Sequence, residues 1–270
     1  MDSLRGEGEG VDKSGYSLLN RTPRKFLREL STDRPDLTES PYTVDAGWVQ
    51  LEADFFSSTH DRQGQEGGEI NTNTVSFSAL NIKVGLTPKI DLQTVIEPYV
   101  RVRSFDRSEG SSTQFASFSD VLTRLKINFW GNDGGETALG LMPFVKWPTK
   151  HHGTGNDSFE GGLIVPYARK LPHAWDMGAM TEIDLVRNDA DNGYTHEWTN
   201  SVTFGHDLPY GFGGYMEVAT TIRRGPTLAS FDVGLTYGIG KNFQLDLGCN
   251  VGLNSATDDL TFFCGWSGRF

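Results

Sequence analysis

Apolar and polar residues alternate with a period of two along most of the chain after about residue 43, which predicts β-strands. The alternation is clearest at the carboxy-terminus, where Phe262, Cys264 and Trp266 share one face, Arg269 lies on the other, and the pattern runs to Phe270. An exposed terminal strand frays or aggregates in a soluble protein. In a membrane barrel it closes against the first strand, and its outer face meets lipid. The pattern therefore predicts a transmembrane β-barrel.

The same alternation predicts about twelve strands, and their connections alternate in length. The predicted strands fall at about 43–57, 80–86, 91–102, 121–129, 139–146, 161–170, 179–185, 194–205, 212–221, 228–238, 243–253 and 260–270. Turns after even strands are short, whereas 58–73, 104–117 and 149–160 form long polar loops after odd strands. Short periplasmic turns and long external loops are typical of outer-membrane barrels, and an even strand count puts both termini in the periplasm. We predict an all-β, closed, antiparallel, up-and-down barrel in the bacterial outer membrane.

The segment before the first strand shows neither a helical nor a strand period. Residues 1–42 are rich in charge, and Pro35 and Pro41 favour an extended, turn-rich conformation. We therefore divide the chain into an irregular segment, 1–42, and a barrel, 43–270. The irregular segment is expected to lie in the periplasm or to plug the lumen, with a disordered beginning. Residues 1–20 lack the apolar core of a signal peptide, so we expect the printed start to be processed or misassigned.

Composition excludes a helical membrane protein. The chain has 270 residues, 37% hydrophobic and 22% charged, with a mean hydropathy of -0.40. The longest apolar run, Ala138 to Val145, is far shorter than the roughly 20 residues that a membrane helix needs. A soluble β-sandwich is the alternative, but it would bury about a dozen inward charges at several kcal/mol each. The net charge of -11 argues against nucleic acid as a partner.

The charges predicted to face the lumen are grouped by sign. A basic wall on strands three to five consists of Arg101, Arg103, Arg124, Lys126 and Lys146. An acidic wall on strands seven and nine to eleven consists of Glu182, Asp184, Glu217, Asp232 and Asp246. Since strand four faces strand ten in a twelve-stranded ring, the two walls would produce a transverse field that orients dipolar solutes. Alternatively, these charges neutralise one another or bind an inserted plug through Asp33, Arg34, Asp36 and Glu39.

Cys249 and Cys264 lie on the two strands of the final hairpin. A turn centred on residues 256–257 would place them directly opposite each other, with Cβ atoms about 4.5–5.5 Å apart, near disulfide distance. The periplasm permits such a bond. Two separate lipid-facing thiols are the alternative.

The sequence predicts no enzyme, metal site or cofactor. His151, His152 and Ser158 fall in one polar loop, and no serine lies at a spacing that brings it beside a histidine on a strand. Adjacent histidines point apart in an extended chain, which disfavours a shared metal. The WGNDGG segment, 130–135, opens no helix after a strand, so it is interpreted as a turn and not as a phosphate-binding loop.

Three segments resemble the outer-membrane "transporter" family, also described as the meta-pathway of phenol degradation family. They are STDRPDLTESP (31–41), LTRLKINFWGNDGGETALGLMPFVKWPT (122–149) and DVGLTYGIGKNFQLDLGCNVGLNSATDDLTFFCGWSGRF (232–270). The resemblance covers most of residues 31–270, and the cysteine pair departs from the family pattern. It implies an outer-membrane barrel that admits small, often aromatic, compounds.

Together these observations predict a channel in contact with outer-membrane lipid, through which a small solute diffuses along a narrow charged lumen. A ring of twelve tilted strands has a backbone radius of roughly 12 Å, which leaves room for a small solute once side chains fill it. The alternative is a plugged barrel that scaffolds a protein partner through the amino-terminal segment or the external loops. Conductance separates these two hypotheses.

Overall fold

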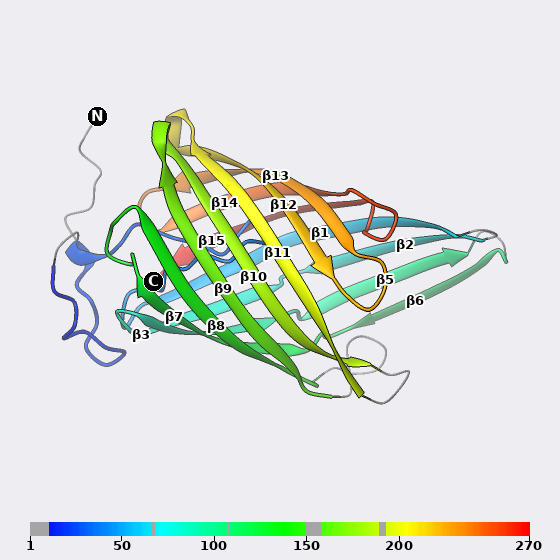
Figure 1. Cartoon of the computed structure of the whole chain (residues 1–270), viewed down its shortest axis with the longest axis horizontal. Coiled ribbons are helices and arrows are strands. Elements are labelled where there is room, and N and C mark those ends of the chain that lie inside the picture. Colours follow the sequence, from blue (N-terminus) through cyan, green and yellow to red (C-terminus); the bar gives the residue numbers. More distant parts are fainter. Residues whose placement is uncertain (1–10, 66–67, 107–108, 150–157, 189–192) are drawn as a thin grey trace.

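The computed structural model describes residues 11–65, 68–106, 109–149, 158–188 and 193–270 (Figure 1). Three short 3-10 helices occur in this part of the chain: η1 (Arg24–Phe26), η2 (Pro172–Ala174) and η3 (Pro209–Gly211). The strands are β1 (Val49–Gln65), β2 (Gly68–Phe77), β3 (Leu80–Thr87), β4 (Ile90–Ile96), β5 (Tyr99–Asp106), β6 (Ser111–Ser117), β7 (Val121–Trp130), β8 (Thr137–Trp147), β9 (Glu160–Leu171), β10 (Trp175–Asn188), β11 (Gly193–Asp207), β12 (Phe212–Ile222), β13 (Leu228–Ile239), β14 (Phe243–Gly252) and β15 (Leu260–Arg269). Within the described ranges, no helix has the length and apolar character needed to span a membrane.

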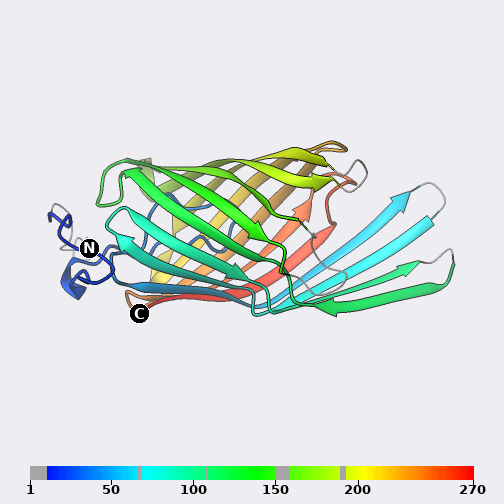
Figure 2. The same ribbon diagram turned by 90° about the horizontal axis from the view of Figure 1, so that it is seen from below.

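Twelve of these strands form a closed antiparallel ring, as the sequence predicts. The ring runs β1, β3, β4, β7 and then β8 to β15 in chain order. It closes where β15 pairs with β1, with Gln50 opposite Arg269 and Ala53 opposite Trp266. The short connections, the described beginning of the chain and the carboxy-terminus lie at one end of the ring, which we call the terminal end, and the longer hairpins lie at the other, the far end (Figures 1 and 2).

The remaining three strands extend the sheet beyond the ring. The second half of β1 pairs with β2, β2 with β5, and β5 with β6. These four segments, which we call the outer sheet, project past the far end of the ring (Figure 2). The prediction of polar loops at 58–73 and 104–117 is therefore wrong. Most of these residues form hairpins whose strands carry polar side chains on both faces, so they lack the apolar alternation of a lipid-facing strand.

The ring has an inverted distribution of polarity. The largest fully buried side chains include Lys83, Lys126, Glu52 and Glu217, all of which point into the ring. Large apolar side chains instead cover the outer surface of the strands, with exposures of about 40–55%. Examples are Val145, Ile183, Leu185, Val202, Val218, Val233, Leu235 and Leu247. A polar interior within an apolar exterior is the pattern of a barrel surrounded by lipid.

Aromatic side chains border this apolar surface at both ends. At the terminal end, Phe212 packs on Tyr237 at 4.7 Å between ring centroids, and Phe243 stacks on Trp266 at 5.5 Å. At the far end, Trp147 packs on Phe159 at 5.5 Å, and Phe56, Phe77 and Tyr99 form a ladder across β1, β2 and the start of β5. Paired aromatic girdles mark the two interfaces of a membrane-spanning barrel, so the outer sheet lies beyond the far interface.

The predicted pairing of the two cysteines is wrong. In the final hairpin, Cys249 lies opposite Phe262 and Cys264 lies opposite Leu247, and both thiols are free. The turn is centred between residues 255 and 256, one residue earlier than we expected, and this shift moves the cysteines two positions apart across the ladder. Directly opposed Cβ atoms, which the disulfide hypothesis requires, do not occur here.

Candidate functional site

The candidate site is the interior of the ring, which the amino-terminal segment enters from the terminal end (Figure 1). Residues 11–48 contain no strand, and residues 1–10 lie outside the described part of the chain. Residues 31–41, which we call the lumen segment, contact side chains from eight strands of the ring: β1, β3, β4, β7, β10, β11, β12 and β14. Since these strands lie on all sides of the ring, the lumen segment lies inside it.

Asp33 lies at the centre of the first group of contacts. Its carboxylate oxygens are each 2.5 Å from a lysine ammonium nitrogen, Lys83 on β3 and Lys126 on β7. Lys83 also pairs with Glu52 on β1. Burial alone would raise the pKa of Asp33, but the two ammonium groups hold this pKa well below its usual range. The carboxylate also accepts a hydrogen bond from the backbone N–H of Ser40 at 3.0 Å, which closes the lumen segment into a compact loop.

Arg34 and Glu39 bind different parts of the ring wall. The guanidinium of Arg34 binds Asp246 on β14 through two nitrogens, at 2.7 and 3.3 Å, and Asp54 on β1 at 2.5 Å. Glu39 pairs with Arg124 on β7. Burial raises the pKa of Glu39 to about 7, against the opposing effect of Arg124. Breaking a buried pair of this kind by removing one partner typically costs about 3–5 kcal/mol.

Glu217 on β12 holds the tip of the lumen segment. Its carboxylate accepts hydrogen bonds from the backbone N–H groups of Leu37 and Thr38, both at 2.8 Å, and from the Thr38 hydroxyl. The same hydroxyl lies 2.7 Å from that of Ser201 on β11. Burial raises the pKa of the neighbouring Asp36 to about 8, and the Glu217 carboxylate adds to this rise.

Glycines in the ring wall make room for the amino-terminal segment. A Cβ atom on Gly85 would lie 2.1 Å from the backbone oxygen of Asp45. One on Gly178 would lie 3.2 Å from the side chain of Thr38. At Gly85 any side chain would collide with the backbone, and at Gly178 the side chain of Thr38 would have to shift, so the wall is shaped around the segment.

A second network of ion pairs closes the terminal end. The carboxylate of Asp45 lies 3.4 Å from Lys13 and 3.5 Å from both Arg28 and Arg269. Arg28 in turn binds Asp133, in the β7–β8 turn, at 2.8 Å. This network joins the amino-terminal segment to the last strand and was not predicted from the sequence.

The predicted basic wall is divided by the structure. Arg124 and Lys126 on β7 face the interior and bind Glu39 and Asp33. Lys146 on β8 lies nearer the far end, 3.0 Å from Glu160. Arg101 and Arg103 lie on β5, which is outside the ring, and both are exposed, so their predicted lumen position is wrong. The reason is that strand three is broken at Pro98, and only its first half, β4, belongs to the ring.

The acidic residues lie on the ring strands expected for them. Glu182 and Asp184 are on β10, close enough to each other to interact. Glu217 lies opposite Asp232 on β13, and Asp246 on β14 holds Arg34. Lys83, Glu52 and Asp54 were not among the predicted site residues, although their inward positions in the alternating pattern were a usable signal.

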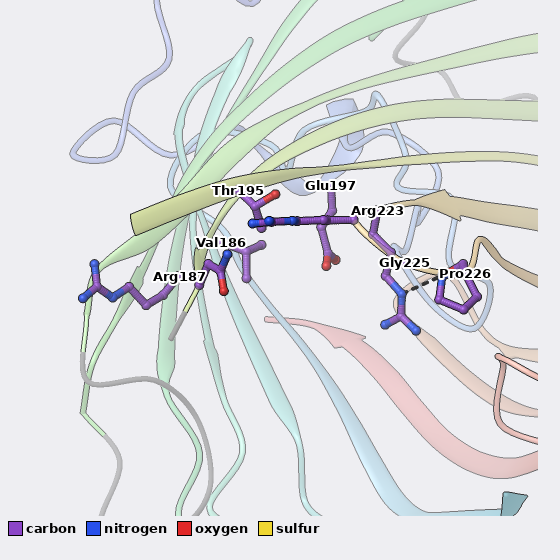
Figure 3. Close-up of a pocket in the computed structure, with 9 residues that line it drawn as sticks. Val186, Arg187, Thr195, Glu197, Arg223, Gly225 and Pro226 are labelled. Atoms are coloured by element: carbon purple, nitrogen blue, oxygen red, sulfur yellow. Dashed lines mark hydrogen bonds between the residues drawn. The ribbon is translucent and has the colours of Figure 1, made fainter. Parts of the chain in front are cut away.

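Two cavities lie beyond the lumen segment, toward the far end. The smaller, about 150 Å³, is lined by Leu37 of the lumen segment and by polar residues of β12 to β15 such as Asn250 and Thr261. The larger, about 330 Å³, lies between the ends of β10 and β11 and the β12–β13 turn (Figure 3). Its lining includes Glu197 and Arg223, and the Arg223 Nε atom donates to the backbone oxygen of Pro226 at 3.2 Å.

The described residues form no metal centre in either cavity. No group of three or more His, Cys, Asp or Glu residues in the described ranges is arranged to hold a metal ion. His151 and His152, considered as a candidate metal pair from the sequence, lie outside the described residues.

Solved structures with the same fold have different functions. The chain is similar to an outer membrane channel from Pseudomonas putida F1, with 11% identity over 89% of this chain and 100% of that chain and a TM-score of 0.61. It is also similar to the translocator domain of the autotransporter NalP from Neisseria meningitidis, with 9% identity over 82% and 88% and a TM-score of 0.54. The β domain of the Bordetella autotransporter BrkA matches with 13% identity over 82% and 98% and a TM-score of 0.50. At these identities the likeness establishes the fold alone.

Sequence comparison identifies the family. No curated protein matches the chain. A family profile described as "Putative MetA-pathway of phenol degradation" matches residues 32–270, which include the lumen segment from its second residue and the whole barrel. The chain therefore belongs to this family.

Proposed function

We propose that this protein is an outer-membrane channel for small solutes, including aromatic or weakly polar compounds, whose lumen is closed by the lumen segment in the conformation described here. Both termini lie in the periplasm on this proposal, and the outer sheet lies outside the cell. The family description and the similarity to the Pseudomonas putida channel support this assignment.

The observation that carries the proposal is the way in which the lumen segment is held. Its contacts are ion pairs and hydrogen bonds to ring side chains, with a small apolar contribution. The hydrophobic cluster nearest to it consists of Met142, Ile164, Met180 and the partly buried Phe144. A segment held by charge can exchange its partners for water and ions when it moves, whereas an apolar plug would lose its hydrophobic stabilisation.

The second candidate function is a plugged barrel that scaffolds a partner protein. The same contacts favour it if the lumen segment never leaves the ring. In that case the network of Asp33, Arg34 and Glu217 would be a permanent structural core of the barrel. The partner would then bind the far-end hairpins or the beginning of the chain.

Liposome swelling tests the channel against the scaffold. Purified full-length protein is reconstituted, and swelling is measured with a small aromatic alcohol and with a pentose, beside a variant that lacks residues 1–41. We expect uptake by the full chain that increases in the truncated variant. Absence of uptake by the full chain, with a pore only after truncation, would favour the scaffold. A folded truncated variant that is no more permeable than the full chain would contradict a closing role for the segment.

A further inference from the structure

The outer sheet has one face that continues the lipid-facing surface of the ring. Its β1 residues continue the outer face of the pair of strands, β1 and β15, that closes the ring: Ser58 lies opposite Phe262, which is 53% exposed on the outside of the ring. The same face carries the aromatic ladder, with centroid distances of 5.6 Å between Phe56 and Phe77 and 6.1 Å between Phe77 and Tyr99. This face therefore begins at the membrane interface and rises from it.

Two arginines follow the ladder along β5. Arg101 is two residues beyond Tyr99 and Arg103 is four residues beyond it, and since side chains alternate, all three share one face. With a rise of about 3.4 Å per residue and a tilt of about 40°, the Cα atoms of the two arginines stand roughly 5 and 10 Å above that of Tyr99 along the membrane normal. The polar headgroup layer on each side of a bilayer is about 5–8 Å thick. Their guanidinium groups thus reach the depth of lipid headgroups.

The part of this face next to the membrane interface is positive although the chain is strongly acidic. Three cross-strand rows above the ladder contain no acidic residue: Ser58, Val75, Arg101, Ala116; His60, Asn73, Arg103, Gln114; and Arg62, Asn71, Phe105, Ser112. The opposite face of the same strands carries Asp61 and Asp106. In a protein with a net charge of -11, this separation of charge between the two faces points to an anionic partner on the outer one.

A neutral amide binds Arg101, and a second polar pair lies in the cross-strand row of Arg103. A guanidinium nitrogen of Arg101 donates to Gln114 Oε1 at 2.8 Å, and His60 Nδ1 lies 2.7 Å from Asn73 Oδ1. Arg62, farther from the interface, is already paired with Asp259 at 3.3 Å. Arg101 and Arg103 are therefore the cationic centre of the face, and the planar fork of each is suited to a phosphate group.

We propose that this face, centred on Arg101 and Arg103, binds the phosphate groups of a phosphorylated, multiply acylated glycolipid of the outer leaflet, such as lipid A. The inference rests on the proposed orientation, in which the outer sheet lies on the external side. Acyl chains of the bound lipid would lie along the apolar strands below the Phe56–Phe77–Tyr99 ladder, and the sugar phosphates would meet the guanidinium groups above it.

Native mass spectrometry of the full chain in detergent tests the proposal, with bisphosphorylated lipid A and its dephosphorylated form as probes. The test variant is R101Q/R103Q, and the matched control, R169Q/K170Q, removes two exposed charges at the terminal end of β9. We expect the wild type and the control to prefer the phosphorylated lipid. The test variant should bind it on the order of tenfold more weakly, because two cations near the headgroups are lost.

Equal binding of phosphorylated lipid A by the test variant and the wild type would overturn the proposal, as would equal binding of both probes by the wild type. Heat-modifiable migration on an unboiled gel verifies that each variant is folded. The binding assay requires no solute passage, so its outcome is independent of the proposed channel function, which conductance tests separately.

Discussion

Replacing Glu217 with alanine should release the tip of the lumen segment. The carboxylate accepts hydrogen bonds from Leu37 N–H and Thr38 N–H at 2.8 Å each and from the Thr38 hydroxyl. An unsatisfied buried donor costs about 1–3 kcal/mol. The sum of three such costs is reduced because water can enter the vacated space. It is reduced further because removing the Glu217 carboxylate ends its charge repulsion with Asp36. We expect a net loss of about 3 kcal/mol in docking free energy, which shifts the ratio of released to docked segment about a hundredfold.

Single-channel recording in planar bilayers measures this shift as the fraction of time that the channel is open. The matched control is Asp232→Ala, which removes a carboxylate from β13, directly opposite Glu217. The Asp232 carboxylate interacts with Glu217 and not with the backbone of the lumen segment. The open fraction should rise strongly in Glu217→Ala and much less in Asp232→Ala. If the two variants behave alike, hydrogen bonding by Glu217 does not hold the segment and the reasoning fails.

Three other predictions concern pH, selectivity and the thiols. The pKa of Asp36 is raised from 3.8 to about 8, so its contribution to docking is complete below pH 3.8 and is lost as the pH rises from there through about 8. The open fraction should therefore increase between about pH 4 and about pH 8 and level off above that range, and Asp36→Asn should flatten this dependence. Arg124→Glu should change ion selectivity in bilayer recordings, whereas Arg101→Glu, outside the ring, should leave it unchanged; the reverse result would contradict the assignment of these residues. Thiol titration of the denatured, unreduced protein should detect both Cys249 and Cys264, and a value near zero would show that they are bonded.

The ring was predictable because its strands alternate between lipid and a polar interior. The strand Val121–Trp130 illustrates this, because Arg124 and Lys126, which face the interior, alternate with apolar residues that face lipid. The outer sheet was not predictable in this way. Its strands β2 and β6 have polar residues on both faces, and sequences of that kind resemble loops. The error for Arg101 and Arg103 follows directly, because alternation continues through the break at Pro98 without indicating that the ring has ended.

The site was predictable as a set of charges but not as a set of pairs. Asp33, Arg34 and Glu39 stood out as charged residues near two prolines, yet their partners Lys126, Asp246 and Arg124 come from strands brought near one another only when the ring closes. The cysteines illustrate the same limit on a smaller scale. One residue of turn length decides which positions oppose each other, and sequence does not specify that length.

A reversible tether between the lumen segment and the wall tests the central claim, that this segment closes the lumen. The hydroxyl oxygens of Thr38 and Ser201 are 2.7 Å apart, so T38C/S201C in a C249S/C264S background should form a disulfide. The channel should conduct poorly when oxidised and regain the conductance of the C249S/C264S parent when reduced. Equal conductance of the tethered and reduced protein, with the disulfide verified by mass, would contradict the account.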